Sequence, residues 1–322
     1  MISRRLVVAA LAAVSLVGAG MSARAAYPEK PIRLVVQFSP GGGTDAIARA
    51  LGALLAQSLG QPVLVDNKPG ASTMIGSDYV AKAAPDGYTL LIATLAHAVN
   101  PSMQRNMPFD TEKAFAPVTL IGSSYNVLVV RPDSKFSTVA DVIAAAKANP
   151  GKLSYASQGS GTSAHLAGEL FDNLAHVEML HIPYRGAGPA LIDVLGGRVD
   201  MMFATNAASA PFIADKRLRA LGTTAPDGKS PLPGVPSIAQ TIPGYSVDSW
   251  YAVYAPAGTP PAVVDKLAAA VADAAKNPEM VKRAGMEGVT LRPGGPAELR
   301  DFMAGEFTRW RKLVTGNKIT AD

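Results

Sequence analysis

At Phe38-Ser39-Pro40-Gly41-Gly42-Gly43-Thr44-Asp45 a glycine-rich turn joins a predicted strand (residues 33–38) to a predicted helix that Thr44 or Asp45 caps. Unpaired backbone amides at such a helix start, together with the helix dipole, favour an anion. Consecutive glycines followed by a capping residue exceed what a simple tight turn requires. No Lys-Ser/Thr pair follows the glycines, so the triphosphate-binding pattern is absent. The turn therefore predicts a binding site for a small anion.

The rest of the chain alternates short β-branched runs with alanine-rich helical segments, which is the pattern of parallel strands joined by helices. The predicted strands are residues 33–38, 63–67, 88–93, 127–130, 153–156, 179–182, 201–204, 218–223 and 250–255. The predicted helices are a segment from the Thr44 or Asp45 cap with apolar positions over residues 47–59, followed by residues 75–84, 139–148, 164–175, 189–195, 262–276 and 297–313. The chain exceeds what one compact core usually supports, and the pattern restarts at Asn126. We therefore expect an α/β protein with two lobes, the first of them discontinuous.

A second glycine loop, Ser157-Gln158-Gly159-Ser160-Gly161-Thr162-Ser163, follows the predicted strand at residues 153–156 and leads into a helix. With Ala164 it satisfies the dinucleotide fingerprint G-x-G-x-x-G/A. The acidic ribose-binding residue should end the next strand, but Glu178 stands at the beginning of that strand. We therefore expect no dinucleotide cofactor, and two glycine loops indicate two lobes that face one ligand.

An export signal is predicted at the N-terminus. Arg4 and Arg5 precede an uncharged apolar segment (residues 6–20), and Ala23-Arg24-Ala25 is a small-x-small cleavage site, so residues 1–25 are expected to be removed. The chain contains no cysteine, which excludes a lipid anchor at the cleavage site and a disulfide framework. The mature chain is expected to be soluble and periplasmic.

The charge balance argues against nucleic-acid binding. The full chain has a formal charge of +5, and loss of the three arginines in the signal leaves 27 basic against 25 acidic residues. Neither a G-x-S-x-G elbow nor an H-E-x-x-H motif is present. The four histidines are scattered singly, and we expect His165 to be a structural hydrogen-bonding residue. We predict no metal, no cofactor and no catalytic residue, and leave open whether Tyr184-Arg185-Gly186 places a cation at the cleft rim.

Several segments resemble the Bug family, also called the TctC family, of periplasmic receptors of tripartite tricarboxylate transporters. The resemblance covers essentially the whole mature chain in order. It rests on residues 27–33, on the first glycine loop, on Asn67-Lys68-Pro69-Gly70-Ala71, on residues 85–90, on residues 161–171 and on His181-Ile182-Pro183-Tyr184-Arg185-Gly186. It implies a two-lobed Venus-flytrap fold of type II-like topology, in which loops from both lobes hold a ligand carboxylate through backbone amides, small hydroxyls and water.

The resemblance also implies the positions of the ligand-binding residues. The carboxylate site would comprise Phe38, Ser39, Gly41, Gly42, Gly43, Thr44, Ala71, Thr94, Ser157, Gly161, Thr162 and Ser163. Thr205 and Asn206 would contact the other end of the ligand. Ala204 stands where many relatives have an aspartate, which favours a plain carboxylic or dicarboxylic acid over an amino acid. Ser39 replaces a common proline, and Ser72-Thr73 replaces glycines.

The expected lobes are residues 27–126 with 247–322, and residues 127–246. The expected function is capture of a small organic carboxylate (a di- or tricarboxylate, or an aromatic acid) for uptake through the membrane subunits of a tripartite tricarboxylate transporter, by a monomer. A receptor that docks on a membrane signalling kinase is the alternative. A periplasmic enzyme is a third hypothesis that depends on the second glycine loop alone.

Overall fold

The computed structural model describes residues 27–226, 228, 230, 232–316 and 319, so the predicted signal peptide lies outside the described residues. The strands are β1 (Ile32–Val36), β2 (Val63–Asn67), β3 (Thr89–Thr94), β4 (Phe115–Val130), β5 (Ser154–Ser157), β6 (Leu180–Pro183), β7 (Met201–Thr205), β8 (Arg219–Thr223), β9 (Asp248–Pro256) and β10 (Thr290–Leu291). The helices are α2 (Gly43–Leu59), α3 (Met74–Ala81), α4 (Ala96–Met103), α5 (Val139–Ala148), α6 (Ser163–Ala175), α7 (Ala187–Leu195), α8 (Asn206–Ala214), α9 (Pro261–Lys276), α10 (Pro278–Met286) and α11 (Pro296–Gly316), with a 3-10 helix at Ile238–Gln240.

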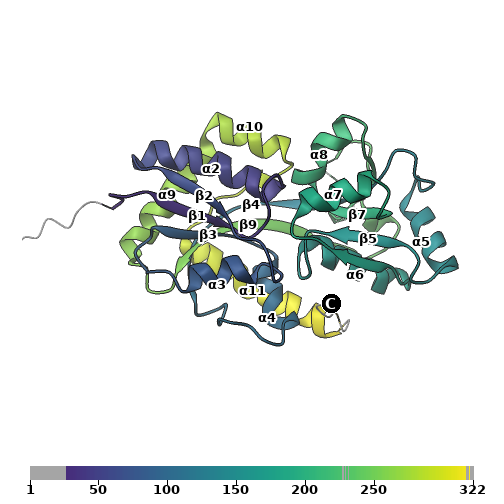
Figure 1. Ribbon diagram of the computed structural model, residues 1–322, viewed down its shortest axis with the longest axis horizontal. Helices are drawn as coiled ribbons and strands as arrows, with labels where there is room; N and C mark the ends of the chain where they lie inside the picture. The colour runs from purple at the N-terminus through teal and green to yellow at the C-terminus, as the bar shows by residue number, and fades with distance from the viewer. Residues whose placement is uncertain (1–26, 227, 229, 231, 317–318, 320–322) are drawn as a thin grey trace, which may run out of the picture.

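The strands form one mixed sheet in the order β2-β1-β3-β9-β4-β7-β5-β6, and β8 and β10 also pair with β4 (Figure 1). Strand β4 belongs to both halves of this sheet. Its residues 115–125 pair with β9, whereas residues 126–130 pair with β7 and β8. The two halves are covered by different helices and form two lobes, which confirms the predicted two-lobed α/β fold.

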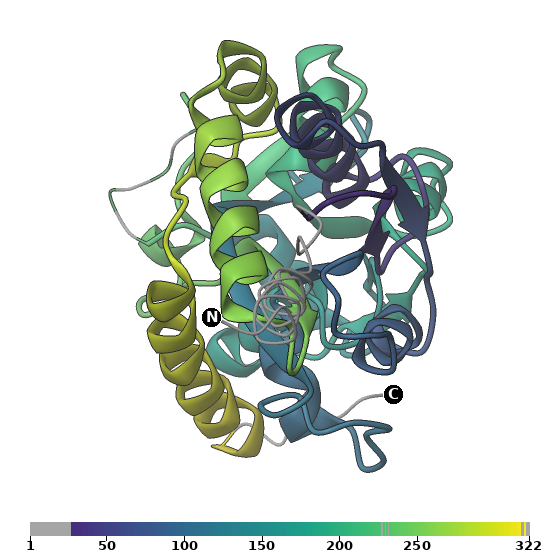
Figure 2. The same cartoon turned by 90° about the vertical axis from the view of Figure 1, so that its left-hand side faces the viewer.

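The first lobe buries both faces of its sheet. Leu34 and Val36 of β1 pack with Leu51 of α2 and Leu267 of α9, whereas Val35 between them belongs to the apolar cluster of the opposite face. A strand covered on both faces is mostly apolar rather than alternating, and four of the five β1 residues are buried and apolar, Arg33 being the exposed exception. Figure 2 shows α9, α10 and α11 on the outer side of this lobe.

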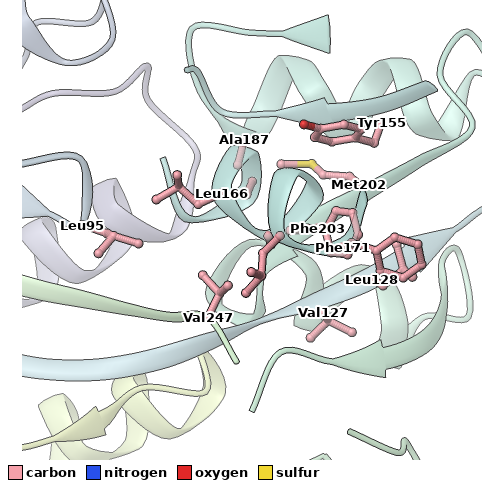
Figure 3. Close-up of a cluster of buried hydrophobic side chains, with 14 of the residues drawn as sticks. Leu95, Val127, Leu128, Tyr155, Leu166, Phe171, Ala187, Met202, Phe203 and Val247 are labelled. Carbon is pink, nitrogen blue, oxygen red and sulfur yellow. The ribbon is translucent and has the colours of Figure 1, made fainter. Parts of the chain in front are cut away.

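The second lobe has its own aromatic core. Phe171 of α6 lies 5.6 Å from Phe203 of β7, and Leu128 and Met202 lie in the same cluster (Figure 3). Burial of each large side chain of this kind contributes about 1.5–3 kcal/mol. This core holds β5 and β7 in place, and the second glycine loop begins where β5 ends.

Some predicted elements differ from those in the structure. Gly42, not Thr44 or Asp45, is the N-cap of α2, and it makes no side-chain capping bond. The predicted strand at 127–130 is only the end of β4, because Pro117 and Gly122 interrupt the apolar pattern where the register of β4 shifts. Helices α4, α8 and α10 and strand β10 were not predicted. Within the described part of the chain, no helix is long and apolar enough to span a membrane.

Candidate functional site: a cavity between the lobes

Loops that follow β1, β2, β5 and β6 meet between the two lobes around a cavity of about 370 Å³, here called the interlobe cavity. Strands β1 and β2 are parallel, and so are β5 and β6, so the four loops leave the carboxyl ends of parallel strands. Ligands of open α/β sheets bind at this edge. The lining residues are Gln37, Phe38, Pro69, Gly70, Ala71, Ser72, Thr73, Ile75, Gln158, Gly159, Ser160, Pro183, Tyr184 and Arg185.

The turn between β2 and α3 has an unusual backbone. Ala71, Ser72 and Thr73 have φ angles of 46°, 52° and 73°, in the left-handed region that residues with side chains rarely adopt. The Asn100 side chain holds the turn, because its Nδ2 donates to the Ser72 carbonyl at 2.7 Å and to Thr73 Oγ1 at 3.2 Å. The amides of Ser72 and Thr73 donate to no acceptor within the described residues. Successive amides in such a turn form an anion-binding concavity beside the interlobe cavity.

The first glycine loop binds a carboxylate of this chain itself. The Gly41 amide donates to Asp45 Oδ2 at 3.1 Å, and Asn67 Nδ2 donates to Asp45 Oδ1 at 2.9 Å. Burial alone would raise the pKa of Asp45, but hydrogen bonds from Arg49, Asn67 and the Gly41 amide outweigh it and hold the pKa below its usual value. The Gly41 amide is therefore used to fix the loop.

The second glycine loop is also held by internal hydrogen bonds. The Gly159 amide donates to Ser157 Oγ at 3.1 Å, and the Gly161 amide donates to His165 Nδ1 at 3.1 Å. Ser157 Oγ lies 2.7 Å from His181 Nε2, and the rings of His165 and His181 stack at 4.1 Å. His165 accepts a hydrogen bond inside the fold, as expected, and a purely structural role for it stays a prediction. The sequence did not predict the stacking of His165 on His181, because the two residues lie far apart in the chain.

Several contacts join the lobes beside the cavity, and three of them are close. The Ser39 amide and hydroxyl both donate to the Arg185 carbonyl, at 3.1 and 3.0 Å. Gly43 begins α2 directly against Ala207 of α8, where a Cβ on the glycine would lie 2.3 Å from the Ala207 Cβ. A Cβ on Gly161 would lie 2.6 Å from Asn100 Oδ1. Gly43 and Gly161 are thus needed for the close approach of the two lobes.

The structure places the predicted site residues in two groups. Phe38 and Ala71 line the interlobe cavity, and Ser39 connects the lobes at its edge. The others lie outside the lining: Gly41, Gly42, Gly43, Thr44, Thr94, Ser157, Gly161, Thr162, Ser163, Thr205 and Asn206. A role for these residues in ligand contact stays a prediction.

Sequence reasoning missed several lining residues as ligand contacts, among them Gln37, Ser72, Thr73, Gln158 and Ser160. The presence of Ser72 and Thr73 where glycines were expected could have pointed to this turn. A left-handed backbone favours glycine, so side chains kept there suggest a role in the cavity. The Oε1 atoms of Gln37 and Gln158 are buried without a hydrogen-bond partner among the described residues. Such acceptors favour a ligand, or its bound water, that donates hydrogen bonds.

Arg185 is the one charged side chain in the lining, and it makes no ion pair with the described residues. This agrees with the open possibility of a cation at the cleft rim. The neighbouring Tyr184 hydroxyl donates to Asp193 at 2.7 Å, and burial followed by this contact raises the pKa of Tyr184 to about 12. Arg185 is therefore the one formal charge that the described lining offers to an anion. Among the described residues, no group of three or more histidine or acidic side chains is placed to hold a metal ion.

Known proteins share this fold over nearly the whole chain. A model of the "Tripartite tricarboxylate transporter family receptor" family, TctC, matches residues 47–319. A UPF0065 protein encoded in the tcbD-tcbE intergenic region of Pseudomonas sp. (strain P51) is 42% identical over 324 residues, which cover 100% of this chain and 96% of that relative.

Two solved structures are similar as well. An R. palustris protein with adipate is 34% identical, has a TM-score of 0.88, and is matched over 91% of this chain and 99% of its own. MatC from Rhodopseudomonas palustris, with bound malate, is 30% identical, has a TM-score of 0.85, and is matched over 89% of this chain and 100% of its own. Since the family model and these relatives cover almost all of the described fold, the chain belongs to the TctC (Bug) family, the receptors of tripartite tricarboxylate transporters.

Proposed function

We propose that this protein binds a small dicarboxylate in the interlobe cavity, in the periplasm, and delivers it to the membrane subunits of a tripartite tricarboxylate transporter. The observation that carries the proposal is the cavity lining. It combines the amides of Ser72 and Thr73, which have no acceptor among the described residues, with Arg185, a cation that makes no ion pair there. The adipate and malate in two similar structures support a dicarboxylate. Membership in a receptor family supports binding rather than catalysis.

The cavity lining offers two polar features that suit two carboxylates. One carboxylate accepts hydrogen bonds from the left-handed turn at Ser72 and Thr73, and the other faces Arg185. Hydrogen bonds to a charged group contribute about 1.5–3 kcal/mol each, so a few amides hold one carboxylate without a salt bridge. The volume of about 370 Å³ lies within the usual range for small-molecule sites.

We expect the lobes to close around the ligand, because the residues that line the cavity come from both lobes. Residues 37–75 and residues 158–185 come from different lobes, and a ligand that touches both favours the closed state. We place the lobe boundaries at residues 126/127 and 246/247. Strand β4 changes its pairing partner beside the first boundary, and β9 begins beside the second. The closed form is the one we expect the membrane subunits to recognise.

Arg185→Gln tests the site. Ligand-free refolded protein is titrated calorimetrically with adipate and malate, and we expect the variant to bind about three- to tenfold more weakly, because one charge-assisted contact is lost. Arg105→Gln is the matched control, since Arg105 is exposed and lies outside the lining. Equal affinities for the wild type and Arg185→Gln would contradict the proposed site. So would no binding of any mono-, di- or tricarboxylate by the wild type.

An uptake assay distinguishes the proposed transport role from a signalling role. A strain that lacks this protein is given the labelled dicarboxylate that the purified protein binds. We expect uptake to fall, to recover with the wild type, and to recover less with Arg185→Gln. Unchanged uptake alongside measured binding would contradict the transport role.

A further inference from the structure

A second cavity, of about 440 Å³, lies on the first lobe between α4, α11 and the ends of β4 and β9, and is here called the α4–α11 cavity. Helices α4 and α11 pack against each other, as Figure 1 shows at the lower side of the first lobe. It shares no lining residue with the interlobe cavity. Its walls include Phe115 from β4, Tyr254 from β9 and Phe307 from α11. The TctC assignment leaves it unexplained.

A buried histidine without a hydrogen bond faces this cavity. His97 is 3% exposed, and its ring lies 4.9 Å from that of Phe115 and 4.8 Å from that of Tyr254. These contacts fix the ring position. No hydrogen bond to a described residue holds its nitrogens, which are not among the fully enclosed polar atoms that lack a partner. Burial lowers the pKa of His97 to about 3, so the ring is neutral at pH 7. A neutral imidazole presents one N–H donor and one acceptor nitrogen.

A buried hydroxyl without a partner lines the same cavity. Thr111 is 7% exposed, and its Oγ1 is buried without a hydrogen-bond partner among the described residues. Buried polar groups are nearly always paired with protein, water or a ligand. His97 and Thr111 therefore form the polar floor of an otherwise apolar, aromatic cavity, which is the usual composition of a small-molecule site.

The rim of the cavity carries an available cation. Arg300 of α11 is exposed, and it makes no ion pair with any residue in the described ranges. The acidic rim residue, Glu112, lies 3.5 Å from Arg311 instead. A charged group is costly to bury without a partner, whereas a neutral hydroxyl hydrogen-bonds readily to an imidazole and a threonine. The cavity thus has a neutral polar floor, and its rim carries one unpaired cation, Arg300, beside the ion-paired Glu112.

We propose that the α4–α11 cavity is a second ligand site, which takes a hydroxylated aromatic monoanion. The ligand ring packs on the aromatic walls, its hydroxyl bonds to His97 and Thr111, and its carboxylate lies toward Arg300. This site is independent of the dicarboxylate proposed for the interlobe cavity. It makes the protein a receptor for two chemically different ligands.

The test uses 4-hydroxybenzoate as the probe, titrated calorimetrically into the purified protein, with benzoate for comparison. Thr111→Val keeps the shape of the side chain and removes its hydroxyl. We expect it to weaken 4-hydroxybenzoate binding about tenfold and to leave benzoate binding unchanged. Arg300→Gln is expected to weaken both ligands about threefold, because the lost contact is solvent-exposed.

Two tryptophan variants, one that fills the α4–α11 cavity and one control, show which cavity the probe occupies. Ala304 lines the cavity on the exposed side of α11, whereas the exposed Ala297 on the same helix does not. We expect Ala304→Trp to abolish saturable binding of 4-hydroxybenzoate and Ala297→Trp to preserve it. The proposal is overturned if the wild type shows no saturable binding. It is also overturned if Ala304→Trp binds like the wild type, since the probe would then occupy another site.

Discussion

Ser72 has the conformation that a glycine would adopt without cost. Ser72 has a φ of 52° and stands between Ala71 and Thr73, which are also left-handed, in a turn that lines the interlobe cavity. Left-handed backbone costs a residue with a side chain about 1–2 kcal/mol. Strain of this kind concentrates at binding sites, where the surrounding structure holds it in place. Here Asn100 holds the turn through the Ser72 carbonyl.

Ser72→Gly is expected to raise the free energy of unfolding by about 0.5–1 kcal/mol. The relief of backbone strain exceeds the added entropy of glycine in the unfolded chain. Only the carbonyl of Ser72 takes part in the hydrogen bond with Asn100, so that bond remains. Urea unfolding measures the change, and a decrease in stability would contradict the strain argument.

Ser58→Gly is the matched control. Ser58 is exposed in the helix α2, where glycine is less favourable than serine by about 0.5 kcal/mol. The same substitution should therefore destabilise the protein there and stabilise it at Ser72.

At the scale of elements, helix α6 carries an unfavourable acid near its C-terminus. Burial raises the pKa of Asp172 to about 7, the Met179 amide opposes this, and the charges of Glu169 and Glu178 add to it. The folded state therefore holds this proton more tightly than the unfolded chain, in which the carboxyl titrates near 3.8. As a result, folding becomes less favourable as the pH rises from about 4 to about 7.

Asp172→Asn is expected to stabilise the protein, and more so at high pH. The gain in unfolding free energy at pH 8 should exceed the gain at pH 5 by roughly 2 kcal/mol, because a shift of one pKa unit is worth about 1.4 kcal/mol. The asparagine oxygen still accepts the bond that the Met179 amide donates at 2.8 Å. Urea unfolding at both pH values checks this, and an equal gain at each would refute it.

For the molecule as a whole, we predict that the contact between α2 and α8 limits the closure of the lobes. Gly43 begins α2 in the first lobe, and Ala207 lies in α8 of the second. A side chain at position 43 would overlap Ala207, and this overlap is relieved when the lobes separate. Gly42 offers a comparison, because a Cβ there would lie 3.8 Å from its nearest neighbour, an ordinary contact distance.

Gly43→Ala is expected to hold the lobes apart. Under saturating adipate its radius of gyration should exceed that of the wild type in small-angle scattering. Its adipate affinity should fall about tenfold, because the closed state is less populated. Gly42→Ala should match the wild type in both measurements. A Gly43→Ala protein that closes normally would show that α2 and α8 do not limit closure.

Much of the fold was predictable because strong local signals define its elements. The predicted segments 63–67 and 139–148 coincide with β2 and α5, and α5 begins at a Thr138–Asp141 capping box and ends before Pro150. Helices α4 and α8 escaped prediction because each is short and contains a proline, and α8 also lacks an apolar stripe. Their stability comes from packing, which local patterns do not record.

The sequence by itself determined the alternation of strands and helices, the two glycine turns and the family, because these depend on local composition and spacing. Only the tertiary structure decided which amides are available to a ligand. The Gly41 amide donates to Asp45 and the Gly161 amide donates to His165. The amides of Ser72 and Thr73, by contrast, have no acceptor among the described residues and lie beside the cavity. The α4–α11 cavity likewise exists only where α4, β4, β9 and α11 pack together. The physical reason is that hydrogen-bond partners and cavities arise from packing between segments that lie far apart in the chain.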